Sequence, residues 1–155
     1  AQPGILVPKG IGTGSVNVDG TLLYHPLYHE VPDSPLRLTF EDGYLKEIGG
    51  DKLLSSRLEM WLENLGDDSA YCGPVHFNIG NNPNAVLSQS QEWERVYGSV
   101  TCGMGDFSML GELWELPEGI TLHTSDVHWD CTILQPTILI DDKGSADRVI
   151  FFLDW

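Results

Sequence analysis

Histidine and aspartate residues at short spacing are the part of this chain best suited to chemistry. The most polar segment is His123-Thr-Ser-Asp-Val-His-Trp-Asp130. If the segment is extended, His128 and Asp130 point to the same face with Cα atoms ~6.5 Å apart, and Trp129 points the other way into the core. An imidazole and a carboxylate at that spacing can reach one metal ion. The pair alone is a weak signal, because a solvated loop with an incidental pair gives the same pattern.

His76 strengthens the metal hypothesis. Apolar residues alternate with His76 and Asn78 in this region, which predicts a strand with one apolar and one polar face. A core histidine held by backbone hydrogen bonds is the alternative. His76, His128 and Asp130 together supply two imidazoles and one carboxylate, the ligand set of a facial triad with open metal positions. Non-haem Fe(II) oxygenases and zinc hydrolases both use these ligand types, so the ligands alone do not choose between them.

Two further histidines are candidates for proton transfer. His25 and His29 have the i, i+4 spacing of a helix face, but Pro26 and Pro32 argue against a regular helix. We expect them on a mobile loop near the site, as catalytic groups or as part of a solvated loop without a role. His123 is expected to support the sheet rather than bind metal.

Other motifs carry no chemistry of their own. The glycine-rich segment 10–14 has neither the spacing of a phosphate-binding loop nor a following helix. Cys131 lies in no evident electropositive surrounding, so nucleophilic thiol chemistry is not expected. The acidic residues form no EF-hand loop.

Composition limits the class of protein. The chain has 155 residues, of which 41% are hydrophobic, enough for the core of one ordinary domain. No apolar run approaches the roughly 20 residues that cross a bilayer. The 23 acidic and 8 basic residues give a net charge of −15, which argues against nucleic acid and anionic membranes as partners. Three cysteines without a CxxC pair favour reduced thiols and a cytoplasmic location.

Strands outnumber helices in the predicted elements. A hairpin is predicted over 36–40 and 44–48, where Asp42-Gly43 supplies the turn. A helix is predicted over 51–65, since Leu54, Leu58 and Leu62 recur on one face. A second helix is predicted after Pro83. Its expected inward residues are Val86, Trp93, Val96 and Tyr97.

Short strands complete the predicted architecture. They are expected at 16–18, 75–79, 100–104, 120–124, 137–140 and 148–153, with a last hairpin turn at 141–144. The pattern predicts an α+β fold with a mixed, largely antiparallel sheet and two main helices. No internal linker is evident, so residues 1–155 are expected to form a single metal-binding domain.

An ordered set of motifs resembles the C-terminal half of the aminopeptidase T-like superfamily. The motifs are a Gly-Thr-Gly-x-x-x-Val-Asp-Gly strand, the Leu-Thr-Phe-Glu-Asp-Gly-Tyr-Leu-Lys-Glu-Ile-Gly-Gly hairpin, a helix, His-Phe-Asn-Ile-Gly-Asn-Asn-Pro-Asn-Ala, Gly-Met-Gly-Asp, and His-Trp-Asp followed by Pro-Thr-Ile-Leu-Ile-Asp. The resemblance covers roughly Gly12 to Asp142. The superfamily includes metallo-aminopeptidases and the 2,5-dihydroxypyridine 5,6-dioxygenases. Its members are longer, with an N-terminal domain that contributes to the substrate cleft and that this chain is expected to lack.

Single positions separate the two branches. The peptidases have Glu where this chain has His76, and they use a further His before the His-x-Asp motif. The dioxygenase branch is similar to this chain at both positions. The resemblance therefore implies one Fe(II) held by His76, His128 and Asp130, with a small aromatic substrate such as a dihydroxypyridine, and O₂. His25 or His29 would then be the catalytic base.

Two other functions stay open. A hydrolase of the aminopeptidase T type would use Zn or Co and a metal-bound water. A non-catalytic subunit would keep the fold and pack against another chain. Because one sheet face is expected to be an open cleft, a homo-oligomer or a partner chain is expected to complete it.

Overall fold

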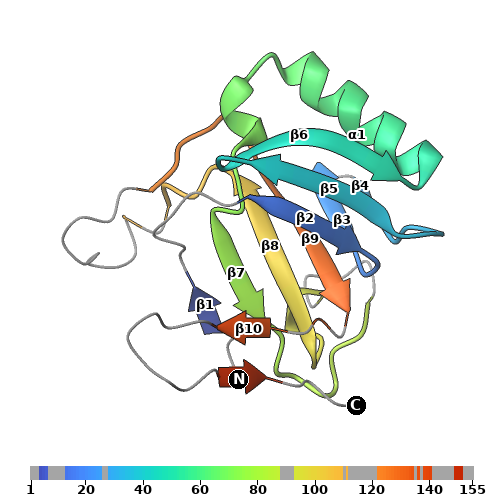
Figure 1. The fold of residues 1–155 in the computed structure, drawn as a ribbon, viewed down its shortest axis with the longest axis vertical. Coiled ribbons are helices and arrows are strands. Elements are labelled where there is room, and N and C mark those ends of the chain that lie inside the picture. Colours follow the sequence, from blue (N-terminus) through green and yellow to red (C-terminus); the bar gives the residue numbers. More distant parts are fainter. Residues whose placement is uncertain are drawn as a thin grey trace.

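The computed structural model describes residues 4–6, 13–25, 28–87, 93–109, 111, 122–134, 136, 138–140 and 149–151. Within them the largest element is a six-stranded sheet, whose strands come from both halves of the sequence (Figure 1). Its strands, in spatial order, are β1 (Gly4–Leu6), β7 (His76–Ile79), β8 (Ser99–Gly105), β9 (His128–Leu134), β3 (Leu22–His25) and β4 (Tyr28–Glu30).

A second sheet packs across the first. It consists of β2 (Gly14–Val18), β5 (Leu36–Glu41) and β6 (Tyr44–Gly50), and helix α1 (Lys52–Leu65) lies beside β6 (Figure 1). A separate ribbon pairs β10 (Ile138–Ile140) with β11 (Val149–Phe151). All pairings between these named strands are antiparallel, so the α+β prediction with a largely antiparallel sheet is confirmed.

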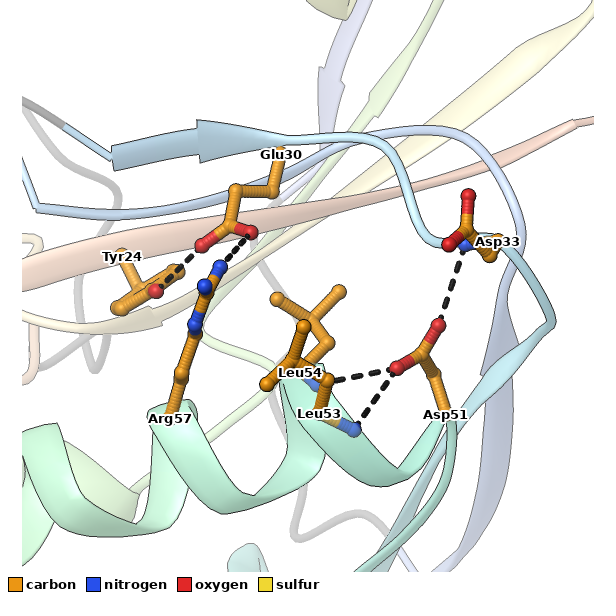
Figure 2. A network of polar contacts seen from close by, with 7 residues as sticks. All are labelled: Tyr24, Glu30, Asp33, Asp51, Leu53, Leu54 and Arg57. Carbon is orange, nitrogen blue, oxygen red and sulfur yellow. Dashed lines mark hydrogen bonds and ion pairs between the residues drawn. The ribbon is translucent and has the colours of Figure 1, made fainter.

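Helix α1 begins and ends where the sequence predicts. The Asp51 carboxylate accepts hydrogen bonds from the backbone N–H groups of Leu53 and Leu54, and Gly66 ends the helix in the left-handed conformation with φ 64°. The other Asp51 oxygen accepts the N–H of Asp33, which ties the segment before β5 to the start of the helix (Figure 2).

An ion pair fastens α1 to the edge of the six-stranded sheet. Arg57 Nη1 lies 2.6 Å from Glu30 Oε2, and the Tyr24 hydroxyl donates to Glu30 Oε1 at 2.7 Å (Figure 2). Tyr24 also meets Trp61 of the helix edge-to-face, with ring centroids 5.5 Å apart. These contacts hold β3 and β4 at a fixed position relative to α1.

One cluster of buried apolar side chains joins the two sheets and α1. Leu58 and Leu62 of the helix, Leu38 of β5 and Trp129 of β9 are all fully buried in it. Trp129 Nε1 donates to the Ala70 carbonyl at 2.8 Å. The prediction that Trp129 anchors its segment in the core is therefore confirmed.

The predicted second helix is wrong where the structure describes it. Residues 83–84 form a turn and 85–87 form no helix. The helix-like part is a single 3-10 turn, η2 (Trp93–Arg95), and residues 88–92 lie outside the described residues. Asn82 explains the difference, because its side chain accepts the N–H of Asn84 and its backbone bonds Arg95 and Tyr97. These bonds offer the chain an alternative to a helix. Val86 and Tyr97, expected to face inward, are exposed, whereas Val96 is buried.

Two later predictions have mixed outcomes. Residues 122–124 form no strand, and 120–121 lie outside the described residues. The strands predicted at 137–140 and 148–153 correspond to β10 and β11, while their turn at 141–144 also lies outside the described residues. Among the described helices, none is long and apolar enough to span a membrane.

Candidate metal centre

The pairing of five strands builds one row of residues across the six-stranded sheet. His76 pairs with Gly103, Gly103 with Asp130, Asp130 with Leu23, and Leu23 with His29. Directly paired residues in antiparallel strands share a face of the sheet. The row therefore lies on the face opposite the core. His128, two positions before Asp130 on β9, lies on that same face.

Three side chains of this face converge on one point. His76 Nε2 lies 3.2 Å from His128 Nε2 and 3.3 Å from Asp130 Oδ1, and His128 Nε2 lies 3.2 Å from Asp130 Oδ2. Ligand atoms held about 2.1 Å from one metal stand about 3.0 Å apart at right angles and about 3.4 Å apart in a tetrahedron. The observed distances fall between these values, so the donors fit one metal ion.

Burial makes this cluster costly without a cation. The side chains of His76 and Asp130 are only 5% and 10% exposed, and His128 forms the open side at 32%. Asp130 Oδ1, which lies 3.3 Å from His76 Nε2, and His76 Nδ1 are both buried and form no well-aligned hydrogen bond. A buried carboxylate oxygen without a well-aligned donor carries a desolvation penalty, which a bound cation would reduce.

Strand β7 has one polar and one apolar face, as predicted, and the polar face is the more buried of the two. His76 and Asn78 are almost fully buried, whereas Phe77 and Ile79 are half-buried against the core cluster. Polar residues of the neighbouring strands extend the same face and are buried as well. They are Ser99 and Thr101 of β8 and Thr132 of β9. These polar side chains are therefore buried rather than solvated, while the cluster of ligands is open on the side of His128.

His128 is oriented by the segment after β8. Its Nδ1–H donates to the backbone carbonyl of Asp106, so Nε2 faces the cluster and, in the neutral imidazole, is the nitrogen that could bind a metal. Burial by itself lowers the pKa of His128. The hydrogen bond and negative charge of Asp130, together with the backbone hydrogen bond and charge of Asp106, outweigh burial, so the pKa is raised overall. For Asp130, burial by itself raises the pKa. The hydrogen bonds and charges of His128 and His76 outweigh burial, so the pKa of Asp130 is lowered overall.

Asp67 and Ser125 fix the loop that leads into β9. Ser125 Oγ donates to Asp67 Oδ2 at 2.6 Å, and the N–H of Asp126 donates to the same oxygen at 2.9 Å. The Ser125 N–H also donates to Asp106 Oδ1 at 3.3 Å. The hydrogen bonds to the Asp67 carboxylate, first among them that from the Ser125 hydroxyl, lower the pKa of Asp67 to about 2. The loop therefore links the end of α1 to the residue that orients His128.

Phe107 packs against both imidazoles. Its ring centroid lies 4.4 Å from that of His76 and 6.0 Å from that of His128. Sequence reasoning missed Asp106 and Phe107 as site residues, although Asp106 ends the Gly-Met-Gly-Asp motif. Spacing alone gives no sign that a backbone carbonyl will meet a histidine 22 positions later.

The two proposed catalytic histidines lie on strands, not on a mobile loop. His29 is in the middle of β4, half-buried, and burial lowers its pKa. Its place in the row is two strands from Asp130, about 10 Å between Cα atoms. His25 ends β3 opposite Tyr28, after a register irregularity, and its side chain lies outside the described part. His123 contacts the Ser69 carbonyl through Nε2, away from the cluster.

Comparison with known proteins gives one solved structure that resembles this fold. No protein family model matches the chain, and no curated protein matches its sequence. The structure of 2,5-dihydroxypyridine dioxygenase from Pseudomonas putida KT2440 superposes with a TM-score of 0.61 at 18% identity. The shared feature is the fold. The match covers 83% of this chain but only 37% of the dioxygenase, so the chain spans about a third of that protein's length.

Proposed function

We propose that the chain binds one Fe(II) through His76, His128 and Asp130 and cleaves the ring of a dihydroxylated aromatic N-heterocycle with O₂. The observation that carries the proposal is the convergence of two Nε2 atoms and one carboxylate within 3.2–3.3 Å. Its place on a fold shared with a 2,5-dihydroxypyridine dioxygenase favours oxygenase over hydrolase chemistry. The same ligand set with open positions is used by non-haem iron oxygenases.

The ligands determine the charge of the site. When bound, Fe(II) would supply adjacent open positions for a ring hydroxyl and O₂, and the electrons that activate O₂. His76 and His128 are neutral ligands, and Asp130 adds one negative charge. The site then keeps one positive charge, which favours a substrate that binds as an anion through its deprotonated hydroxyl.

A base must take the hydroxyl proton from the substrate. His29 lies on the row of the ligands, and burial keeps its pKa below the ordinary value, so its imidazole is neutral at pH 7. We propose that His29 is this base and that one of its ring nitrogens accepts the hydroxyl proton. His25 ends the neighbouring strand and is the second candidate for this role.

Oxygen uptake tests the proposal directly. The purified chain, loaded with Fe(II) under anaerobic conditions, is mixed with 2,5-dihydroxypyridine and air-saturated buffer, and O₂ consumption is measured. We expect stoichiometric uptake and loss of the ring absorbance in the wild type, and neither in His76→Glu. Cleavage of aminoacyl substrates with Zn²⁺ or Co²⁺, without O₂ uptake on any dihydroxylated aromatic, would contradict the dioxygenase and support the hydrolase.

Assembly is part of the same proposal. His128 leaves the cluster open on one side, at 32% side-chain exposure. We propose that a second copy or a partner chain covers this side. Light scattering combined with O₂ uptake checks it, since a fully active monomer would contradict the need for a covering chain.

A further inference from the structure

Gly103 lies between two of the proposed metal ligands. It pairs with His76 on one side and with Asp130 on the other, in the middle of the sheet. Its φ angle is not in the left-handed region, unlike that of Gly105 at 77°. The backbone at position 103 therefore does not require glycine for its conformation, and the reason for a glycine there must be space.

The imidazole of His76 occupies that space. A Cβ at position 103 would lie closer than 3.0 Å to Nε2, Cδ2 and Cε1 of His76, and these three ring atoms are its nearest neighbours. The ring thus lies over the Gly103 backbone, on the way from β7 across β8 to Asp130 on β9. Strands are about 4.8 Å apart, so the His76 imidazole from β7 and the Asp130 carboxylate from β9 can meet above β8 only because β8 carries no side chain there.

The imidazole has little room to move aside. His76 is 4% exposed, Phe107 packs against its ring, and Asp130 and His128 lie at its Nε2. A methyl group at position 103 would therefore displace Nε2 from the point where the three ligands converge. The backbone of β8 is held by pairing on both sides and is the stiffer partner.

We propose that Gly103 is a positioning residue for the metal site, because its missing side chain lets the His76 imidazole lie over β8, where it meets Asp130 and His128. This inference rests on the proposed function, which supplies the metal. The ligands act through their side chains, whereas Gly103 acts by leaving room for one.

A metal titration tests the inference without use of activity. Co²⁺ is added to the metal-free protein and its visible absorption is followed. We expect Gly103→Ala to bind Co²⁺ about 10- to 100-fold more weakly than the wild type, the range for a lost supporting contact. Gly49→Ala is the matched control, because a Cβ there meets nothing within 4 Å, and its affinity should equal that of the wild type.

The two proposals fail in different ways. Absence of Co²⁺ and Fe(II) binding by the wild type would overturn the metal site and this inference with it. Wild-type binding together with unchanged affinity in Gly103→Ala would overturn the role of Gly103 alone and leave the proposed function standing.

A second measurement covers the case in which Gly103→Ala folds poorly. Urea midpoints of the metal-free protein are compared for the wild type, Gly103→Ala, His76→Ala and the double variant. Because His76→Ala removes the atoms that the new Cβ would meet, Gly103→Ala should lower the midpoint less in that background, and the double variant should fold. An equal loss in both backgrounds, or a double variant that does not fold, would overturn the inference.

Discussion

The Nδ1–H of His128 donates to the backbone carbonyl of Asp106, so that Nε2 of the same ring faces Asp130. A side-chain acceptor would vary with each substitution, but a backbone carbonyl is present whatever residue occupies the position. The orientation of His128 therefore depends on the path of the chain around Asp106, which the loop hydrogen bonds maintain.

Removal of a ligand should remove the metal and keep the fold. We expect His76→Ala, His128→Ala and Asp130→Ala each to weaken Co²⁺ binding by more than about 100-fold, beyond the effect of a lost supporting contact. The fold should survive because β9 is anchored from its other face by Trp129. Absorption titration and circular dichroism measure the two effects. His123→Gln is the control, since His123 contacts Ser69 and not the cluster; full metal occupancy in His128→Ala would refute the ligand assignment.

His29 should control the acid side of the pH–rate profile. Because its pKa is lowered by burial, the neutral base persists to below pH 6.5, and activity should fall only as the pH drops beneath that value. His29→Gln should lower kcat by about 10²- to 10⁴-fold, the usual contribution of a general base, and flatten this acid limb. Steady-state O₂ uptake between pH 5 and 8 gives both quantities. A variant with wild-type kcat and an unchanged profile would exclude His29 as the base.

Asp67 should stabilise the loop before β9 in a pH-dependent way. Its pKa of about 2 in the folded protein is below the ordinary 3.8, so its stabilising effect is complete above pH 3.8 and is lost as the pH falls through 2. The difference in urea midpoint between the wild type and Asp67→Asn should therefore shrink from pH 4 to pH 2. A constant difference across this range would mean that the Asp67 carboxylate is not the group held by Ser125.

Leu58 and Leu53 provide a matched pair on α1. Leu58 is fully buried in the core cluster, whereas Leu53 is 63% exposed. Leu58→Ala should lower the free energy of unfolding by about 2–5 kcal/mol, and Leu53→Ala by less than about 0.5 kcal/mol. Chemical denaturation of both variants measures the contrast. Similar losses would show that α1 does not pack with the orientation described above.

Local patterns in the sequence were sufficient for the elements that depend on near neighbours. Asp51 and Gly66 mark the two ends of α1 because capping acts within one helical turn. Asp42-Gly43 and the alternation around His76 likewise predict the β5–β6 hairpin and strand β7. The prediction of a second helix was wrong for the opposite reason. Asn82 bonds residues 13 and 15 positions away, Arg95 and Tyr97, and such contacts leave no trace in local periodicity.

The sequence by itself also identified which residue types could hold a metal, since His76, His128 and Asp130 offer a ligand set at strand spacing. Only the tertiary structure decided that they meet. Their convergence needs β7, β8 and β9 to pair in one register, and a shift of one residue would turn the His76 side chain to the opposite face. It also needs Gly103 between them to carry no side chain. Register is set by the packing of whole strands against the core, a property of the folded chain that no short segment contains.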